Sequence, residues 1–132
     1  MTRRWLVSSG GPYEARFGYS RAVRVGDDVF VSGTTDAGAD GRSTHPGDPA
    51  GQTRAIFEII DRALWEAECT LGDVVRTRIY VTDAAYVAEV AGVHGEVFGR
   101  IRPASTAVVV AGLVDPSLLV EIEAEARKGS AD

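Results

Sequence analysis

RPASTAVVVAGLVDPSLLVEIEAEAR, residues 102–127, is the stretch of sequence on which the fold depends. Residues 105–110 form a run of small and β-branched residues, and Gly112 and Pro116 then indicate a turn. From Leu118 to Ala126 the residues alternate between the two sides of the chain, a period of two that is typical of a strand. We therefore expect a hairpin-like unit of two strands joined by a tight connection.

One face of the second strand carries three carboxylates, those of Glu121, Glu123 and Glu125. Like charges that stand side by side on a strand repel one another unless their face is hydrated or paired with cations. A strand expected at residues 74–81 offers such cations, because Arg76, Arg78 and Tyr80 share one of its faces. A symmetric oligomer would cover this face and pair arginine with glutamate across subunits, so we predict an oligomer.

Three further strands are expected near the N-terminus, at residues 4–8, 19–25 and 29–32. Gly26 and Asp27 supply a hairpin turn between the second and the third. A polar, glycine-rich loop over residues 36–47 follows and separates these strands from the rest of the chain.

Two amphipathic helices are expected in the middle of the chain. Asp48 can cap the first helix and Pro49 suits its first position. Its apolar stripe consists of Ile56, Ile59, Ile60, Ala63, Leu64 and Ala67. Asp83 can cap the second helix, and its inner face should carry Val87, Val90, Ala91, His94, Val97 and Phe98. The strand between them should turn Val75, Thr77, Ile79 and Val81 toward the helices.

These elements give the order βββαβαββ, an α/β arrangement in a single domain that spans residues 1–132. Helices and strands alternate in the middle of the chain, so some strands must be parallel and the sheet is mixed. Two helices can cover only one face of a sheet with five or six strands. The other face must therefore meet water or another subunit.

Composition excludes several classes of protein. The formal net charge is −5 and the basic residues are not clustered, which argues against a nucleic-acid partner. A single cysteine, Cys69, cannot form an internal disulfide and fits a reducing cytoplasm. No apolar run approaches the roughly 18 residues that suggest a membrane span, so no membrane partner is expected. His45 and His94 lie far apart and predict no metal site.

An ordered set of short motifs extends over nearly the whole chain: Gly18-Tyr19, Ser32-Gly33, residues 102–106 (RPAST) and residues 120–124 (VEIEA). In this order, with a long helix between them, the motifs resemble those of the Rid family of reactive-intermediate imine/enamine deaminases, also called the YjgF family. The resemblance implies a chorismate-mutase-like fold, a homotrimer and three clefts at the subunit interfaces. It implies no cofactor.

The resemblance also implies a site. Well-studied members of the family hydrolyse 2-imino or enamine acids to 2-keto acids and ammonia. By the resemblance, Glu121 would position the attacking water, while Tyr19, Ser32 and Gly33 would line the cleft. This chain departs from the pattern where the family has an arginine that holds the substrate carboxylate, because that position is Ser105. Two further cleft positions, a frequent cysteine and an asparagine, are Ala107 and Ala91.

Two interpretations of this departure stay open. Arg21 lies two residues from Tyr19 on the same strand face and could replace the missing arginine, because a guanidinium binds carboxylates bidentately. Alternatively, the substrate has no carboxylate there, and Ser105 and Thr106 offer hydroxyl groups to a neutral molecule. In both cases we expect a trimeric enzyme that hydrolyses an imine or enamine. A non-catalytic trimer that binds a metabolite is the alternative.

Each candidate residue also has a purely structural interpretation. Glu121 could pair with an arginine across the trimer, and Tyr19 could be an ordinary strand aromatic. Ser32 could serve only the turn before Gly33. For His94, on the apolar face of a helix, we expect a hydrogen-bonded core histidine rather than a catalytic one.

Overall fold

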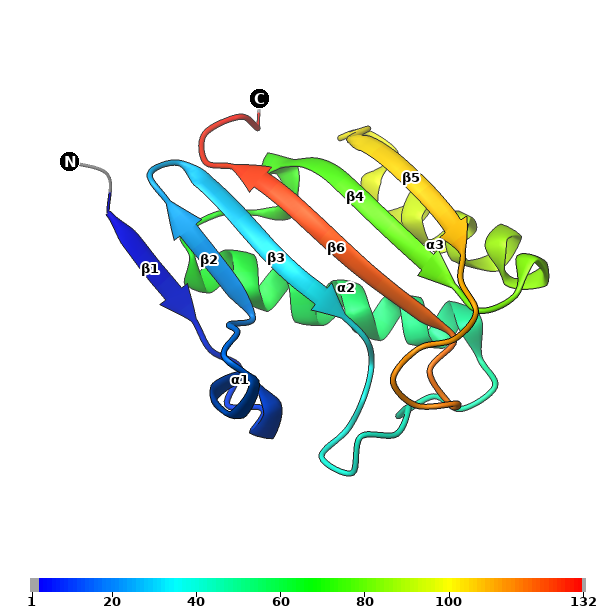
Figure 1. Cartoon of the computed structure of the whole chain (residues 1–132). Coiled ribbons are helices and arrows are strands. Elements are labelled where there is room, and N and C mark those ends of the chain that lie inside the picture. The colour runs from blue at the N-terminus through cyan, green and yellow to red at the C-terminus, as the bar shows by residue number, and fades with distance from the viewer. Residues whose placement is uncertain (1–2, 132) are drawn as a thin grey trace.

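The computed structural model describes residues 3–131 and contains one six-stranded sheet with three α-helices (Figure 1). The elements are β1 (Arg4–Val7), α1 (Pro12–Phe17), β2 (Ala22–Val25), β3 (Asp28–Thr34), α2 (Pro49–Glu66), β4 (Val74–Val81), α3 (Val87–Phe98), β5 (Ala104–Val109) and β6 (Val120–Arg127). Short 3-10 turns at Leu71–Asp73 and Ala84–Tyr86 precede β4 and α3. Apart from α1, this is the expected order of strands and helices.

The strands lie in the order β1-β2-β3-β6-β4-β5. All neighbours are antiparallel except β4 and β5, which are parallel, so the predicted mixed sheet is confirmed. The hairpin-like pairing expected within residues 102–127 is wrong, because β4 lies between β5 and β6. The physical reason is the crossover through α3, which returns the chain parallel to β4 on its outer side, while β6 fills the remaining place between β3 and β4.

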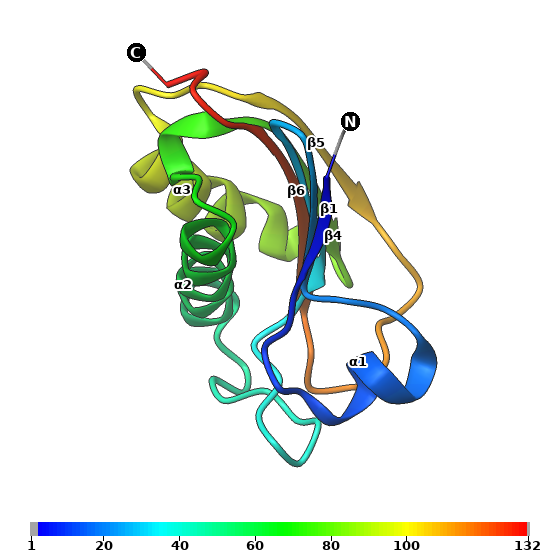
Figure 2. The same cartoon turned by 90° about the vertical axis from the view of Figure 1, so that its left-hand side faces the viewer.

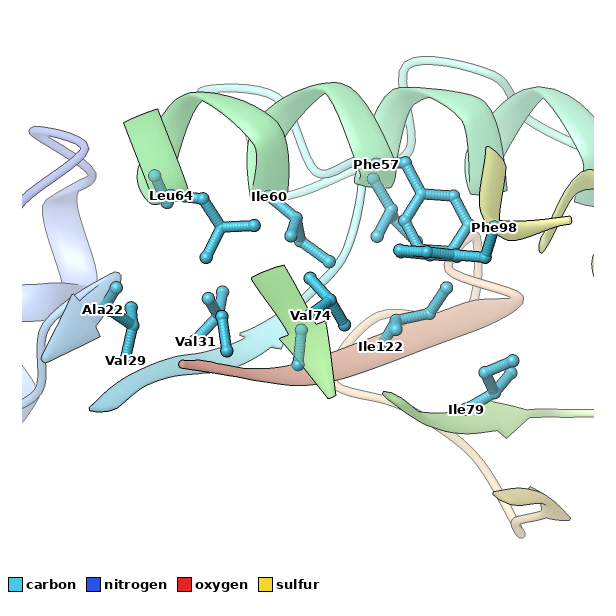
Figure 3. Close-up of a cluster of buried hydrophobic side chains, with 14 of the residues drawn as sticks. Ala22, Val29, Val31, Phe57, Ile60, Leu64, Val74, Ile79, Phe98 and Ile122 are labelled. Carbon is cyan, nitrogen blue, oxygen red and sulfur yellow. The ribbon is translucent and has the colours of Figure 1, made fainter. Parts of the chain in front are cut away.

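Both long helices, α2 and α3, cover the same face of the sheet, as expected (Figure 2). The apolar stripe of α2 packs on β3, β6 and β4, and Figure 3 shows Leu64, Ile60 and Phe57 over Val31 and Ile122. Ile56, Ile60 and Leu64 are fully buried. Asp48 caps the helix as predicted, since its Oδ1 accepts a hydrogen bond of 2.9 Å from the amide of Gly51.

The inner face of α3 is largely as predicted. Val90 and Phe98 are buried, and Val87 and Val97 pack against the core, whereas Ala91 is exposed and Val93 is buried in addition. Asp83 caps the 3-10 turn at Ala84–Tyr86, where it accepts a hydrogen bond of 2.8 Å from Ala85, and α3 begins only after that turn. Asp83 therefore caps the turn that precedes the helix, one step earlier than predicted.

Val75 is 45% exposed, although alternation along β4 predicts that it packs under the helices. The register of β4 with β6 shifts between Val74 and Arg76, which is the signature of a bulge. The extra residue breaks the period of two, so Val74 takes the buried position.

Helix α1 was not predicted from the sequence. Pro12 occupies its first turn, and Gly18 ends it in the left-handed conformation with a φ of 77°. Its six residues are too few to display a helical period of apolar residues. The expected strand at 19–25 therefore begins only at Ala22, and Tyr19 lies in the connection between α1 and β2. Figure 2 shows α1 at one end of the sheet, on the side opposite α2 and α3.

Candidate active site

A cavity of about 620 Å³ lies between α1, the end of β3, the loop after β3 and the start of β6. It is lined by Gly11, Tyr13, Glu14, Phe17, Tyr19, Arg21, Gly33, Thr35, Ala37, Gly38, Gly41, Ile59, Val114 and Glu121. The cavity thus brings together four of the residues that the sequence singled out, Tyr19, Arg21, Gly33 and Glu121. It contains one guanidinium, two carboxylates and several aromatic rings.

Glu121 reaches this cavity because β3 is irregular beside it. The register of β3 with β6 shifts between Val31 and Thr34, so Ser32 and Gly33 form a bulge. The carboxylate of Glu121 lies directly against the α-carbon of Gly33, where a β-carbon would collide with it. A glycine at this position therefore leaves the space that the Glu121 side chain occupies.

We predict that Gly33→Ala displaces the Glu121 carboxylate and lowers any Glu121-dependent activity. The three heavy atoms nearest to such a methyl group all belong to Glu121, and Gly33 is not in the left-handed conformation, so the effect should fall first on Glu121. Thermal unfolding and activity of the two proteins, measured together, check this. Gly92→Ala is the matched control, because nothing lies within 4 Å of a β-carbon there. An alanine enzyme as active as the parent would contradict the prediction.

Burial is the main reason why the pKa of Glu121 lies above its ordinary value, and the charge of Glu123 raises it further. The positive charge of Arg21 opposes both effects. No hydrogen bond or ion pair to the Glu121 side chain is recorded within residues 3–131. A carboxylate whose pKa is raised is a stronger base than an exposed glutamate, and one whose oxygens are not engaged by neighbours is free to accept a proton from water.

Arg21 lies beside Gly33, on the same wall of the cavity. Its Nη2 donates a hydrogen bond of 2.7 Å to the carbonyl oxygen of Gly33. Its Nε is buried and has no hydrogen-bond partner. No carboxylate of residues 3–131 comes within ion-pairing distance of this guanidinium, although it is partly buried.

Tyr19 and Ser32 differ in what they can do. The ring of Tyr19 is 43% exposed and forms part of the cavity wall, so it is not a packed strand aromatic. The hydroxyl of Ser32 donates a hydrogen bond of 2.6 Å to the carbonyl of Ser20 and does not line the cavity. The structural interpretation therefore fits Ser32, which ties the start of β2 to the bulge of β3.

Ser105 and Thr106 lie on β5, away from the cavity within this chain. Ser105 pairs with Thr77, and its Oγ accepts a hydrogen bond of 2.8 Å from the Thr77 hydroxyl on the helix-covered side of the sheet. Thr106 pairs with Arg78 on the other face. The hydroxyl of Thr77 also lies 2.8 Å from Nε2 of His94, so the predicted hydrogen-bonded core histidine is confirmed.

Some of the charged side chains on the uncovered face of the sheet pair with one another within the chain. Glu125 pairs with Arg78 at 2.8 Å and with Arg76 at 3.9 Å, and Glu123 accepts a hydrogen bond from the Tyr80 hydroxyl. We expected these arginines to pair with glutamates of another subunit, but in the structure both arginines pair with Glu125 of the same chain. Exposed apolar residues remain on the same face, among them Leu6, Phe30 and Val108.

Helix α1 supplies site residues that the sequence did not reveal. Tyr13 and Phe17 stack with ring centroids 5.8 Å apart and line the cavity. Glu14 is 5% exposed and is held by the hydroxyl of Ser8 and by the amide and hydroxyl of Ser9. Burial alone would raise the pKa of Glu14, but these hydrogen bonds outweigh it and lower the pKa. The sequence signals that could have indicated this helix are Pro12 at its start and Gly18 at its end.

Gln52 joins the two loops that close the cavity. It is fully buried in α2, and its amide nitrogen donates hydrogen bonds to the carbonyls of His45 and Ser117. Its Oε1 accepts a hydrogen bond of 2.9 Å from the amide of Leu119. The loop after β3 and the loop before β6 are thereby fixed to the same helix.

Within residues 3–131, no group of three or more His, Cys, Asp or Glu side chains is arranged to hold a metal ion. None of the helices in this part of the chain combines the length and the apolar character needed to cross a membrane.

Comparison with known proteins identifies relatives of this chain. Residues 12–128 match the model of a family described as endoribonuclease L-PSP. An uncharacterized protein of Streptomyces coelicolor is 39% identical over 126 residues, which cover 96% of this chain and 93% of that protein.

Two solved structures are similar over almost their whole length. One is from Mycobacterium tuberculosis and is described as a member of the YjgF/YER057c/UK114 family. It is 50% identical, with a TM-score of 0.86, and the match covers 95% of this chain and 99% of that one. The other, from Yersinia pestis, is described as a protein of unknown function of the conserved Rid family. It is 28% identical, with a TM-score of 0.83 and the same coverage.

Proposed function

Because the chain belongs to the family described as endoribonuclease L-PSP, which includes the YjgF and Rid proteins, we propose that it hydrolyses an imine, an enamine or a related reactive intermediate by adding water. The observation that carries the proposal is the Glu121 carboxylate, which faces a cavity, lies against Gly33 and has a raised pKa. Such a group is a stronger base than an exposed glutamate and can accept a proton from water.

In the proposed reaction, the oxygen of a water molecule bonds to the carbon of the C=N group while Glu121 accepts a proton from that water. The electron pair of the C=N double bond moves to the nitrogen, and Glu121 gives its proton to that nitrogen, so that a carbinolamine forms. Glu121 then removes the proton of the carbinolamine hydroxyl and passes it to the nitrogen. The C–N bond breaks as the C=O bond forms, and a carbonyl compound and ammonia leave. An enamine would first take up a proton at carbon to become the imine. No cofactor is required.

Ser105 separates this chain from a standard 2-imino-acid deaminase. A serine at that position cannot bind a carboxylate bidentately, because it offers one hydroxyl in place of a planar guanidinium. Ser105 and Thr106 would line a cleft with Glu121 only if a second subunit contributes β5. We propose such a cleft in a homotrimer, for which the exposure of every β5 residue and of Leu6 and Phe30 is the supporting observation.

The test is a coupled assay with the purified full chain. An amino-acid oxidase would generate 2-imino acids, an amine oxidase would generate imines that lack a carboxylate, and ammonia release would be followed with each. We expect acceleration over buffer with at least one imine class, from a particle that has the mass of three chains. An intact trimer without acceleration on any imine would overturn the proposed reaction and favour the metabolite-binding alternative. A monomer would overturn the shared cleft.

The family description names an endoribonuclease, but the charge of this chain does not favour that activity. The net charge is −5, and the two arginines at the centre of the uncovered face are engaged with Glu125. A surface that binds RNA needs free cations and stacking aromatic groups beside one another.

A further inference from the structure

We propose that the cavity beside α1 binds a small carboxylate that carries an aromatic ring, with Arg21 holding the carboxylate and the aromatic residues of α1 holding the ring. This deepens the proposed function, because it names a substrate class for the same cavity. It also differs from the pattern implied by the family resemblance, in which the carboxylate-binding arginine stands on β5.

Arg21 is the positive group of the cavity and is incompletely paired. Of its donors, Nη2 is bound to the Gly33 carbonyl, and the buried Nε has no partner. A buried donor without a partner costs free energy, since it has lost its water and gained nothing. An entering carboxylate would supply the missing acceptor after a small rotation of the guanidinium, in the bidentate geometry that this group favours.

The acidic groups near Arg21 leave room for such an anion. Glu14 already accepts hydrogen bonds from Ser8 and Ser9, so its charge is stabilised by the loop before α1. Glu121 lies against Gly33, and both glutamates act on Arg21 through their charge without an ion pair to it within residues 3–131. A ligand carboxylate would therefore add the direct partner that neither glutamate provides.

The apolar part of the cavity fits an aromatic group. Tyr13 and Phe17 stack on each other with an interplanar angle of 28°, and Tyr19 completes the wall. These three rings are between 43% and 64% exposed, which is unusual for large apolar side chains gathered at one place. Ile59 of α2 and Val114 of the loop before β6 add aliphatic surface. An aromatic ring that enters here would be held by stacking and by burial of apolar area.

The position of Arg21 also fits the chemistry. It shares the cavity with Glu121, whereas Ser105 lies on β5 on the other side of the sheet. A ligand whose carboxylate meets Arg21 would place the atom next to that carboxylate near Glu121. An imine at this carbon would thus stand within reach of the water that Glu121 activates.

Isothermal titration calorimetry of the full chain tests the proposal with three probes: phenylacetate, its neutral analogue phenylacetamide, and acetate. We expect phenylacetate to bind at least 10-fold more tightly than either of the others, because only it has both the charge and the ring. Arg21→Met should weaken phenylacetate roughly 10- to 100-fold, the effect of one charge-assisted contact. The same variant should change phenylacetamide binding little, which shows that the cavity is intact.

Arg62→Met is the matched control, since Arg62 is exposed on α2 and does not line this cavity. Arg21→Lys keeps the positive charge but loses the planar guanidinium, so its affinity for phenylacetate should lie between those of the parent and Arg21→Met. Equal affinities for phenylacetate and phenylacetamide in the parent chain would overturn the proposal even if Arg21→Met did not fold. The proposal would also be overturned if phenylacetate did not bind the parent chain. If the Phe17→Ala variant then failed to form the trimer, α1 would be a subunit contact and not part of a ligand site.

The two proposals fail separately. Glu121→Gln should lower imine hydrolysis roughly 10²- to 10⁴-fold yet keep phenylacetate binding, since removing a nearby negative charge reduces the repulsion of an anion. If the chain hydrolyses an imine but does not bind phenylacetate, only the proposed class of ligand is overturned. Phenylacetate binding without turnover of any imine would overturn the proposed reaction alone.

Discussion

The substitution Glu121→Gln is expected to lower kcat for imine hydrolysis by roughly 10²- to 10⁴-fold, the usual contribution of a positioned general base. Glutamine keeps the size of the side chain that lies against Gly33 but cannot accept a proton from water. Affinity for the substrate should change much less than kcat. Steady-state kinetics of the two proteins at equal trimer content would measure both quantities.

Glu123→Gln is the matched control, because Glu123 lies on the same face of β6 and bonds to Tyr80 rather than to the cavity. It should keep most of the rate. A loss for Glu123→Gln as large as for Glu121→Gln would mean that the face acts through its total charge and not through one base.

The pH dependence supplies a second check on Glu121. A general base works only when ionised, so the rate should rise with pH as Glu121 loses its proton. Because burial raises the pKa of Glu121, this rise should come at a higher pH than an exposed glutamate would give. Arg21 lowers that pKa and Glu123 raises it. Arg21→Met should therefore move the rise to higher pH and Glu123→Gln should move it to lower pH.

The substitution Gln52→Leu is expected to lower the free energy of unfolding by about 3–5 kcal/mol, since three backbone groups lose their partner at a buried site. Leucine has a similar volume and keeps the helix packed, so the loss measures the hydrogen bonds. The loops on either side of the cavity should also become mobile. Urea unfolding gives the free energy, and amide hydrogen exchange at Ser117–Leu119 reports the loop.

Two variants on the same helix control for other effects. Arg54→Ala removes an exposed side chain with a weak ion pair to Glu96 and should stay within about 0.5 kcal/mol of the parent. Gln52→Glu keeps the acceptor for Leu119 but loses both donors, so it should also be clearly destabilised. If Gln52→Leu is as stable as Arg54→Ala, water has replaced the lost bonds and Gln52 does not hold the loops.

Features that depend on neighbours along the chain could be predicted from the sequence. The apolar stripe of α2 follows from its helical period, and the alternation around Glu121 follows from the period of a strand. The cap at Asp48 is local too, whereas α1, which ends at Gly18, was not predicted because it is too short for its period to be seen. Membership of the family could be inferred because its motifs are short contiguous segments in a fixed order.

Which of these segments meet could not be predicted, because it depends on contacts between distant parts of the chain. The insertion of β6 between β3 and β4 is set by a crossover through α3, and no local pattern near residues 102–127 reports it. The bulge at Ser32-Gly33 places Glu121 against Gly33, and the α1 connection places Arg21 in the same cavity. Ser105 and Glu121 seemed to belong to one unit in the sequence, yet β4 separates them within the chain. The physical reason is that side-chain partners depend on strand order, register and bulges, which arise from contacts between distant segments.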